Sequence, residues 1–153
     1  MLIINGGQTG VDRAVLDFCI RYNINYTGYV SDAEDLTANQ LVIKYPNLIN
    51  ENDSNIQRTK KNIELADWLI CISDPRTQEN NIIQDSRDFA NQWVLFNIYS
   101  NKIINDALNW YKSLPNKDIK VCIGGARESW NPGIYQETFS KLEIIYQYLK
   151  NST

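Results

Sequence analysis

The chain has 153 residues and contains no histidine. Histidine is the usual base of hydrolytic triads and the commonest metal ligand, so its absence excludes Ser-His-Asp, Cys-His and imidazole–metal chemistry. There are few cysteines: Cys19, Cys71 and Cys122 lie far apart in apolar segments and form no C-x-x-C pair. Their spacing indicates buried, reduced thiols rather than a zinc site or a disulfide framework. We expect no metal site.

Long apolar runs and an excess of positive charge are missing as well. No apolar run approaches the ~20 residues that a membrane-spanning helix needs, and no charged-then-apolar leader precedes the first strand. The formal net charge is −3, and the only dense basic group is Arg58, Lys60 and Lys61, which we expect on a helix face. A general nucleic-acid binder would carry a basic stripe. We therefore expect a cytoplasmic protein that binds neither nucleic acid nor a membrane.

Apolar segments with the spacing of strands and helices alternate along the chain. The expected strands are residues 2–4, 24–29, 68–72, 93–98 and 119–123, and the expected helices are residues 10–22, 54–65, 82–92, 103–111 and 132–149. A chain of this length is enough for one domain. Strands and helices that alternate with short connections predict an α/β fold, with a doubly wound parallel sheet of about five strands in a single domain over residues 1–153.

One stretch, residues 30–53, shows no regular pattern. Its start is polar, and Tyr45-Pro46-Asn47 is a turn signal. A loop this long is uncommon in a compact domain unless it serves a site. We interpret it as a long loop that forms a lid or rim, with one helical turn around residues 36–42.

The amino-terminal stretch predicts an anion site. The first strand leads into a turn made of Asn5, Gly6, Gly7, Gln8, Thr9 and Gly10, and a helix that carries Asp12 and Arg13 follows. The first amides of a helix lack intrahelical partners, and its dipole places partial positive charge there. Thr9 and Asp12 also fit a capping box, and Arg13 also fits a solvated helix surface. The glycine spacing matches neither the dinucleotide nor the Walker pattern.

Polar loops follow two further strands. The loop after residue 72 offers Asp74, Arg76 and Thr77, and the loop after residue 123 offers Gly125, Arg127, Glu128 and Ser129. Arginine suits bidentate recognition of a phosphate or carboxylate, although Arg127 also fits an ion pair with Glu128 or Asp12. Trp130 could either stack on a ring of the ligand or cover the start of the next helix. Asn131-Pro132 predicts that this helix begins near residue 132. These residues complete the candidate binding set.

Three segments resemble one known family. GGQTGVDRAVLD at residues 6–17, RT-x-x-N followed by AD at residues 58–67, and GARES with PGIY at residues 125–135 resemble the putative molybdenum carrier family, a branch of the LOG-like (lysine-decarboxylase-like) Rossmann proteins. The resemblance runs nearly end to end. It implies a Rossmann-like sheet of order 2-1-3-4-5. That order would put the fifth strand three steps, ~14 Å, from the first, and the ligand at the switch point of strand order.

The sequence departs from the resembled family at two places. Relatives carry a glycine pair near the position of Thr77, which this chain lacks, and a basic cluster where this chain has acidic residues at 32–35. The acidic residues would repel a second anionic group. The LOG enzymes that cleave nucleotides use a G-G-x-G-T-x-x-E loop, which is missing here. This argues against that reaction.

The patterns together predict binding of a phosphorylated small molecule, nucleotide- or pterin-like, at the Gly6–Gly10 loop. Molybdenum cofactor is the ligand that the family name implies, and a nucleotide is the other candidate. The alternatives are a hydrolase of nucleotide-type substrates, with Asp12, Asp74 or Glu128 as base, and an interaction domain without a ligand. Ile144 and Tyr148 lie off the core stripe of the last helix and suggest a patch for a homo-oligomer.

Overall fold

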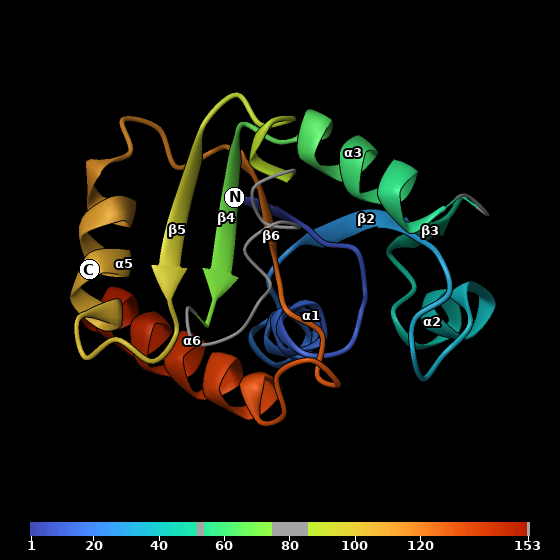
Figure 1. Ribbon diagram of the computed structural model, residues 1–153. Helices are drawn as coiled ribbons and strands as arrows, with labels where there is room; N and C mark the ends of the chain where they lie inside the picture. The colour runs from blue at the N-terminus through green and yellow to red at the C-terminus, as the bar shows by residue number, and fades with distance from the viewer. Residues whose placement is uncertain (52–53, 75–85, 153) are drawn as a thin grey trace.

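The structure is a computed structural model that describes residues 1–51, 54–74 and 86–152. These residues form one parallel sheet with helices packed against it (Figure 1). The strands are β1 (Leu2–Ile4), β2 (Tyr26–Val30), β3 (Leu48–Asn50), β4 (Trp68–Ser73), β5 (Trp93–Asn97) and β6 (Lys120–Gly125). The helices are α1 (Val11–Tyr22), α2 (Ala38–Lys44), α3 (Asn55–Leu65), α5 (Ile103–Ser113) and α6 (Ile134–Asn151). The predicted α/β fold with a parallel sheet is confirmed.

The sheet is covered differently on its two faces. Helices α1, α5 and α6 pack together against one face, whereas α3 packs against β1, β2 and β6 on the other (Figure 1). Successive side chains of a strand point to opposite faces. In β1, Ile3 therefore joins the core under α1, and Ile4 joins the smaller core under α3. We call these the α1 face and the α3 face.

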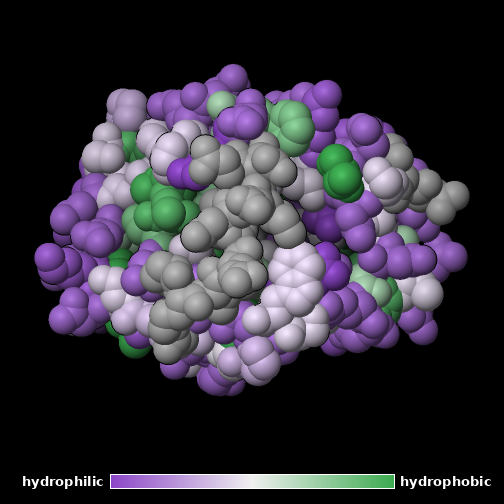
Figure 2. All heavy atoms as spheres, in the orientation of Figure 1, coloured by the Kyte–Doolittle hydropathy of each residue, from purple (hydrophilic) through white to green (hydrophobic). Residues whose placement is uncertain are grey.

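The α3 face is only partly covered by helix. On edge strand β5, Phe96 is buried in the core of the α1 face, whereas Trp93 and Leu95 are 45% and 43% exposed. Figure 2 shows apolar side chains gathered over β5 on the side that faces the viewer. The described part of the α3 face thus leaves apolar surface uncovered.

The predicted strand order 2-1-3-4-5 is wrong. The observed order is β3-β2-β1-β6-β4-β5, so the last strand lies between β1 and β4. The side-chain amide of Asn5, which is completely buried, donates to the carbonyl of Ile123 at 3.1 Å. Because β1 and β6 are paired neighbours, the ~14 Å separation expected between them is wrong too, and their loops meet directly.

The segment 30–53 contains more structure than predicted. Within its described part it forms α2 and a sixth strand, β3, which pairs with β2 at the edge of the sheet. Helix α2 begins with a capping box, in which the Thr37 side chain accepts from the Gln40 amide and the Gln40 side chain accepts from the Thr37 amide. In the described part of the segment, the irregular residues are 31–37, the turn before β3 and Glu51.

The start of the last helix and the helix expected after β4 differ from the predictions. Helix α6 begins at Ile134 rather than near Pro132, with Gly133 at the N-cap, because the Asn131 side chain donates to Asp74 instead of capping the helix. Of the helix predicted over residues 82–92, residues 82–85 lie outside the described part, residues 86 and 87 are helical, and residues 88–92 are not helical, so the prediction is wrong beyond residue 87. In the described ranges, no helix is long and apolar enough to cross a membrane. The three cysteines are free and buried, as predicted.

Candidate functional site

The glycine turn connects β1 to α1 and is pressed against the loop that follows β6. Gly10 has φ +80°, and a Cβ there would lie 2.3 Å from the Ala126 carbonyl oxygen. The Val11 amide donates to that same oxygen at 3.0 Å. Only glycine tolerates both the positive φ and the close approach. The geometry therefore fuses the first and last polar loops into one surface.

The turn satisfies much of its own hydrogen bonding. The Gly7 amide donates to the Asn5 side chain at 2.8 Å, the Gln8 amide to Asp12 at 3.3 Å, and the Thr9 amide to the Gln8 side chain at 3.0 Å. The prediction that bare amides of this turn wait for an anion is wrong for these three donors. The prediction is wrong also for the first amide of the helix, that of Val11, which donates to the Ala126 carbonyl. An anion at this turn would find these four amides already engaged.

A cavity of about 600 Å³ lies behind the turn, on the α3 face. Its inner wall is the sheet, through Leu69, Cys71 and Cys122, and its outer wall is α3. Gly6 and Gly124 form its boundary at the carboxyl ends of β1 and β6. The cavity lies beyond these strand ends, at the point where the order of the strands in the sheet reverses. Open α/β sheets bind ligands at such a point. The predicted location of the site is consistent with this cavity.

Arg58 is the charged group that points into this cavity from α3. The residue is only 8% exposed, and a Cβ on Gly6 would lie 1.8 Å from its Nη1 atom, so the guanidinium lies flat against the glycine turn. Its ion pair with Asp12 is long, at 3.9 Å. Among the described residues its buried Nε has no hydrogen-bond partner. Burial lowers the pKa of Arg58, and the Asp12 carboxylate opposes that change.

Asn62, one turn further along α3, fixes the orientation of the helix. Its side chain accepts from the Tyr29 amide at 2.8 Å and donates to the Tyr29 carbonyl at 2.9 Å, which clamps α3 to β2. The residue is 2% exposed. Residues four apart lie on the same face of a helix, so the clamp also directs Arg58 toward the sheet.

Asp12 faces Arg58 from α1 and is also buried. Desolvation raises the pKa of its carboxyl to about 6, although Arg58 and the amides of Gln8 and Gly125 act in the opposite direction. The effect of burial on this pKa outweighs that of the Arg58 guanidinium, which lies 3.9 Å away. Asp12 can therefore take up or release a proton near neutral pH.

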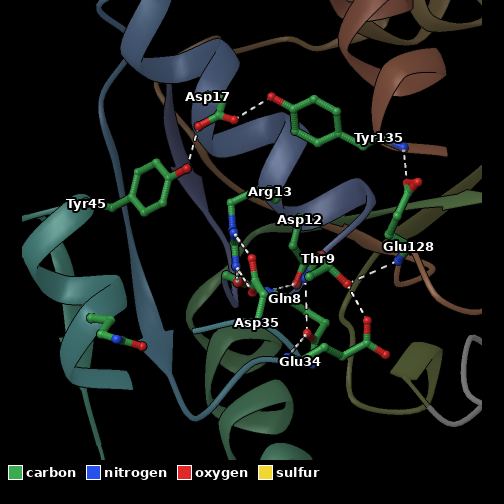
Figure 3. Close-up of polar contacts among 12 residues, drawn as sticks. Gln8, Thr9, Asp12, Arg13, Asp17, Glu34, Asp35, Tyr45, Glu128 and Tyr135 are labelled. Atoms are coloured by element: carbon green, nitrogen blue, oxygen red, sulfur yellow. Dashed lines mark hydrogen bonds and ion pairs between the residues drawn. The ribbon is translucent and has the colours of Figure 1, made fainter. Parts of the chain in front are cut away.

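A second polar cluster lies at the rim of the cavity, around Glu34 in the loop after β2. Its carboxylate accepts from the Thr9 hydroxyl at 2.7 Å (Figure 3). It also accepts from the Ser129 hydroxyl and pairs with Arg127 at 3.5 Å. The Glu34 amide donates to the Gln8 side chain at 2.9 Å. We call Thr9, Ser129 and Arg127, with the Glu34 carboxylate that they hold, the rim cluster.

Arg13 is engaged away from the cavity. It makes two hydrogen bonds of 2.8 Å with the Asp35 carboxylate and one of 3.1 Å with the Gly7 carbonyl (Figure 3). Its side chain is 8% exposed, so the prediction of a solvated residue does not hold. Arg13 instead ties the loop after β2 to the glycine turn.

Glu128 serves the fold rather than the cavity. Its carboxylate accepts from the amides of Gly133 and Tyr135 at 2.7 and 3.0 Å, so it caps the start of α6, and its own amide donates to the Thr9 hydroxyl at 3.1 Å (Figure 3). The alternative capping box between Thr9 and Asp12 is not formed, since the N-cap of α1 is Gly10 and makes no side-chain bond. Glu128 is thus unavailable as a base.

The remaining predicted residues are divided between the wall, the rim and the undescribed part. Gly125 lies in the wall, where a Cβ would be 2.2 Å from the Ile72 carbonyl oxygen. Asp74 is buried and accepts from Asn131 at 3.1 Å. Arg76 and Thr77 lie outside the described residues. The guanidinium of Arg127 stacks 4.2 Å over the ring of Trp130, and both residues line the cavity.

Two buried thiols also line the cavity wall. Desolvation raises the pKa of Cys71 to about 11, and the pKa of Cys122 is raised further by the same cause. Both therefore stay protonated near neutral pH and are weak nucleophiles. Within the described ranges, no three cysteine, aspartate or glutamate side chains come close enough to hold a metal ion.

Sequence reasoning missed Arg58 and Asn62 as site residues. Both stood within the RT-x-x-N segment, but the basic group at residues 58–61 was considered only as a basic helix face and was not linked to the site. The available signal was spacing: Arg58, Asn62 and Ala66 recur every four residues, on the stripe that also holds Ile63. That stripe is the buried side of α3.

Comparisons with known proteins show what the whole chain is similar to. The model of the circularly permutated YpsA SLOG family matches residues 3–146. Among solved structures, the chain is similar to a putative molybdenum carrier protein from Syntrophus aciditrophicus, with 28% identity and a TM-score of 0.74. That similarity covers 94% of this chain and 93% of the other. No curated protein matches the chain. The family match includes all three candidate loops and the whole of α3.

Proposed function

This chain belongs to the circularly permutated YpsA SLOG family, and we propose that it binds a phosphorylated, nucleotide- or pterin-like small molecule in the cavity beside Arg58. The observation that carries the proposal is the buried guanidinium of Arg58, whose Nε has no partner among the described residues. The resemblance to putative molybdenum carriers that the motifs indicated is confirmed, and it agrees with a ligand-binding role.

Burial of Arg58 is costly without a close anion. A charge taken out of water costs several kcal/mol unless it is paired and hydrogen-bonded. The Asp12 carboxylate at 3.9 Å compensates only in part, and its own pKa of about 6 shows that it is poorly stabilised as an anion. A phosphate of the ligand, with oxygens matched to the guanidinium fork, would satisfy Arg58 directly.

The rest of the cavity suits a flat ring. Its sheet and helix walls are mainly apolar, with Ile63, Leu69 and Phe89, and Trp130 at the rim is 47% exposed. The volume of about 600 Å³ is in the range of small-molecule sites. An aromatic ring over one end and a single cation at the other would orient a molecule with a heterocycle and a phosphate.

A phosphorylated pterin such as molybdenum cofactor fits this donor set. The similar structure from Syntrophus aciditrophicus is named a putative molybdenum carrier protein. In this chain Arg58 would hold the phosphate and the apolar wall would hold the pterin. The wall thiols Cys71 and Cys122 have raised pKa values, so we assign the grip of the protein to the phosphate and the ring rather than to the metal.

The test is a binding measurement on matched charge variants. We expect a nucleoside monophosphate or a phosphorylated pterin to raise the melting temperature of the wild type and to bind in calorimetry. Arg58→Met should lower the affinity at least tenfold, whereas Arg21→Met, which removes an exposed cation of α1, should leave it unchanged. Gly6→Ala should also weaken binding, because its Cβ displaces the Arg58 guanidinium. Equal binding by the Arg58 and Arg21 variants would refute the proposed anchor.

A hydrolase is the second candidate, and one observation favours it. Asp12 is a buried carboxyl of pKa about 6 that lines the cavity beside a cation, which suits a general base acting on water. The activity would be assayed as hydrolysis of nucleoside monophosphates, and the release of phosphate or of the free base would be measured. Asp12→Asn should abolish the hydrolysis while the ligand still binds, and retention of turnover in that variant would exclude Asp12 as the base.

A further inference from the structure

The rim cluster has the composition of a small anion site. Two hydroxyls, from Thr9 and Ser129, and the guanidinium of Arg127 converge on one point from the loops after β1 and β6. That point is next to the amino terminus of α1, where the helix dipole favours negative charge. Arg127 and Gln8 also line the cavity, so the cluster lies at its mouth. The group that these donors hold is the carboxylate of Glu34.

We propose that Glu34 fills a second anion subsite of the binding cavity with its own carboxylate, so that the protein selects ligands with one anionic group over ligands with two. The proposal rests on the proposed function, since it describes the specificity of the same cavity. The ligand class is thereby narrowed to monophosphates. A diphosphate, or a ligand with two separate phosphates, would have to displace Glu34 from the rim cluster.

Displacement of Glu34 is disfavoured by how its loop is held. Its own amide donates to the Gln8 side chain, and the next residue, Asp35, is fixed by two hydrogen bonds from Arg13. The loop thus has anchors on both sides of the carboxylate. Hydrogen bonds from Ser129 and Thr9, together with the charge of Arg127, lower the pKa of Glu34, so it stays charged at neutral pH and repels a second phosphate.

The experiment compares monophosphates with diphosphates. Calorimetry measures the affinity of adenosine and guanosine monophosphates and of the corresponding diphosphates for the wild type, Glu34→Gln and Glu64→Gln. Glu64 is an exposed carboxylate of α3 that pairs with Lys60, so its variant makes the same charge change away from the rim cluster. We expect the wild type and Glu64→Gln to prefer the monophosphate at least tenfold. Glu34→Gln should bring the two affinities within about threefold, a change of at least ~0.7 kcal/mol in the preference.

A second variant distinguishes the effect of the Glu34 charge from that of the rigidity of the loop after β2. Ser129→Ala removes one of the bonds that hold Glu34 but leaves its charge in place, so the preference for the monophosphate should persist. Loss of the preference in Ser129→Ala would show that packing, not charge, excludes the second phosphate, and would overturn the inference.

The outcomes also separate this inference from the proposed function. If the wild type binds monophosphates and diphosphates equally well, the inference fails and the binding function stands. If Glu34→Gln keeps the wild-type preference, the inference fails in the same way. If no monophosphate binds to the wild type, the nucleotide form of the proposed function fails, and the selectivity inferred from it fails too.

Discussion

The two faces of the sheet are built for different purposes. Among the described residues, the α1 face carries twenty buried core residues, such as Leu16, Val121 and Ile134, to which α1, α2, α5 and α6 all contribute. In the same part of the chain, the α3 face has a core of six residues, and beside them lies a cavity of about 600 Å³ that contains the Arg58–Asp12 pair. The described α1 face is thus mainly an apolar core, whereas the described α3 face combines a small core with a charged cavity.

The two faces differ in the charge of their buried polar groups. On the α1 face, the Asp17 carboxylate accepts from the hydroxyls of both Tyr45 and Tyr135 (Figure 3). Among the described residues, the atoms without a partner on that face include Trp110 Nε1 and Thr138 Oγ1, which are neutral. On the α3 face, the unpartnered atom is Nε of Arg58, which belongs to a charged group that lines the cavity. A buried charge costs more to leave unsatisfied than a neutral group, so Arg58 is the exception that a ligand would best explain.

The largest expected effect compares one leucine on each face. Leu16→Ala in α1 should lower the free energy of unfolding by about 4 kcal/mol, because a fully buried side chain leaves a cavity in a packed core. Leu69→Ala in β4 should cost about 2 kcal/mol, because Leu69 already borders the cavity and loses fewer contacts. Urea denaturation of the two variants checks this. Equal losses would mean that the α3 face is packed as tightly as the α1 face.

The second prediction concerns pH. The pKa of Asp12 is about 6 in the folded chain against 3.8 as its ordinary value, so between these pH values the folded state binds more protons than the unfolded state. Stability from this group is therefore greatest below pH 4, and it falls as the pH rises to about 6. The gap between the two pKa values corresponds to roughly 3 kcal/mol.

Asp12→Asn removes this titration. The free energy of unfolding of the variant, minus that of the wild type, should therefore rise by roughly 2–3 kcal/mol between pH 4 and pH 7. Denaturation curves at half-unit intervals measure it. A difference that stays flat across that range would show that Asp12 is not desolvated in the folded protein.

Much of the fold could be predicted from the sequence because its signals are local. The continuous apolar run at residues 68–72 and the helical stripe at 103–111 correspond to β4 and α5. Strand β3 was missed because only Leu48 of its three residues is buried, so no run marks it. Helix α2, by contrast, carried a readable signal in its capping box from Thr37 to Gln40.

Strand order and the anion anchor could not be read in this way. The position of β6 between β1 and β4 depends on contacts across more than a hundred residues, such as that of Asn5 with Ile123, and no local pattern encodes them. Arg58 was misplaced because a basic residue on an amphipathic helix is normally solvated. The clamp of Asn62 on Tyr29 fixes α3 with Arg58 on its buried side, and this contact is not visible in the sequence.

A smaller effect tests the satisfied polar groups of the α1 face. Tyr135→Phe removes one of the two hydroxyls that donate to Asp17, which should lower the free energy of unfolding by about 1 kcal/mol. Burial, and to a smaller extent the hydrogen bond to Asp17, raises the pKa of Tyr135 to about 12. The hydroxyl therefore stays protonated and donates throughout the neutral pH range. Tyr22→Phe, which removes a hydroxyl that donates to Glu143 nearer the surface, is the matched control and should cost less. Equal costs would show that burial adds nothing to the Asp17 bonds.

The smallest expected effect on stability is at Arg58 itself. Removal of one partner from a close buried ion pair usually costs about 3–5 kcal/mol, because the other charge is left uncompensated. Arg58→Met should cost less than about 1 kcal/mol at pH 5.5, since the pair is long and Asp12, with a pKa of about 6, can take up a proton instead. At pH 8 the same substitution should lower the free energy of unfolding by more. Asp12 must then either remain as a buried, unpaired carboxylate or take up a proton at a pH well above its pKa, and both are unfavourable. Denaturation at the two pH values distinguishes a cation kept for its ligand from one that holds the fold together, since a structural pair would be equally costly to break at both.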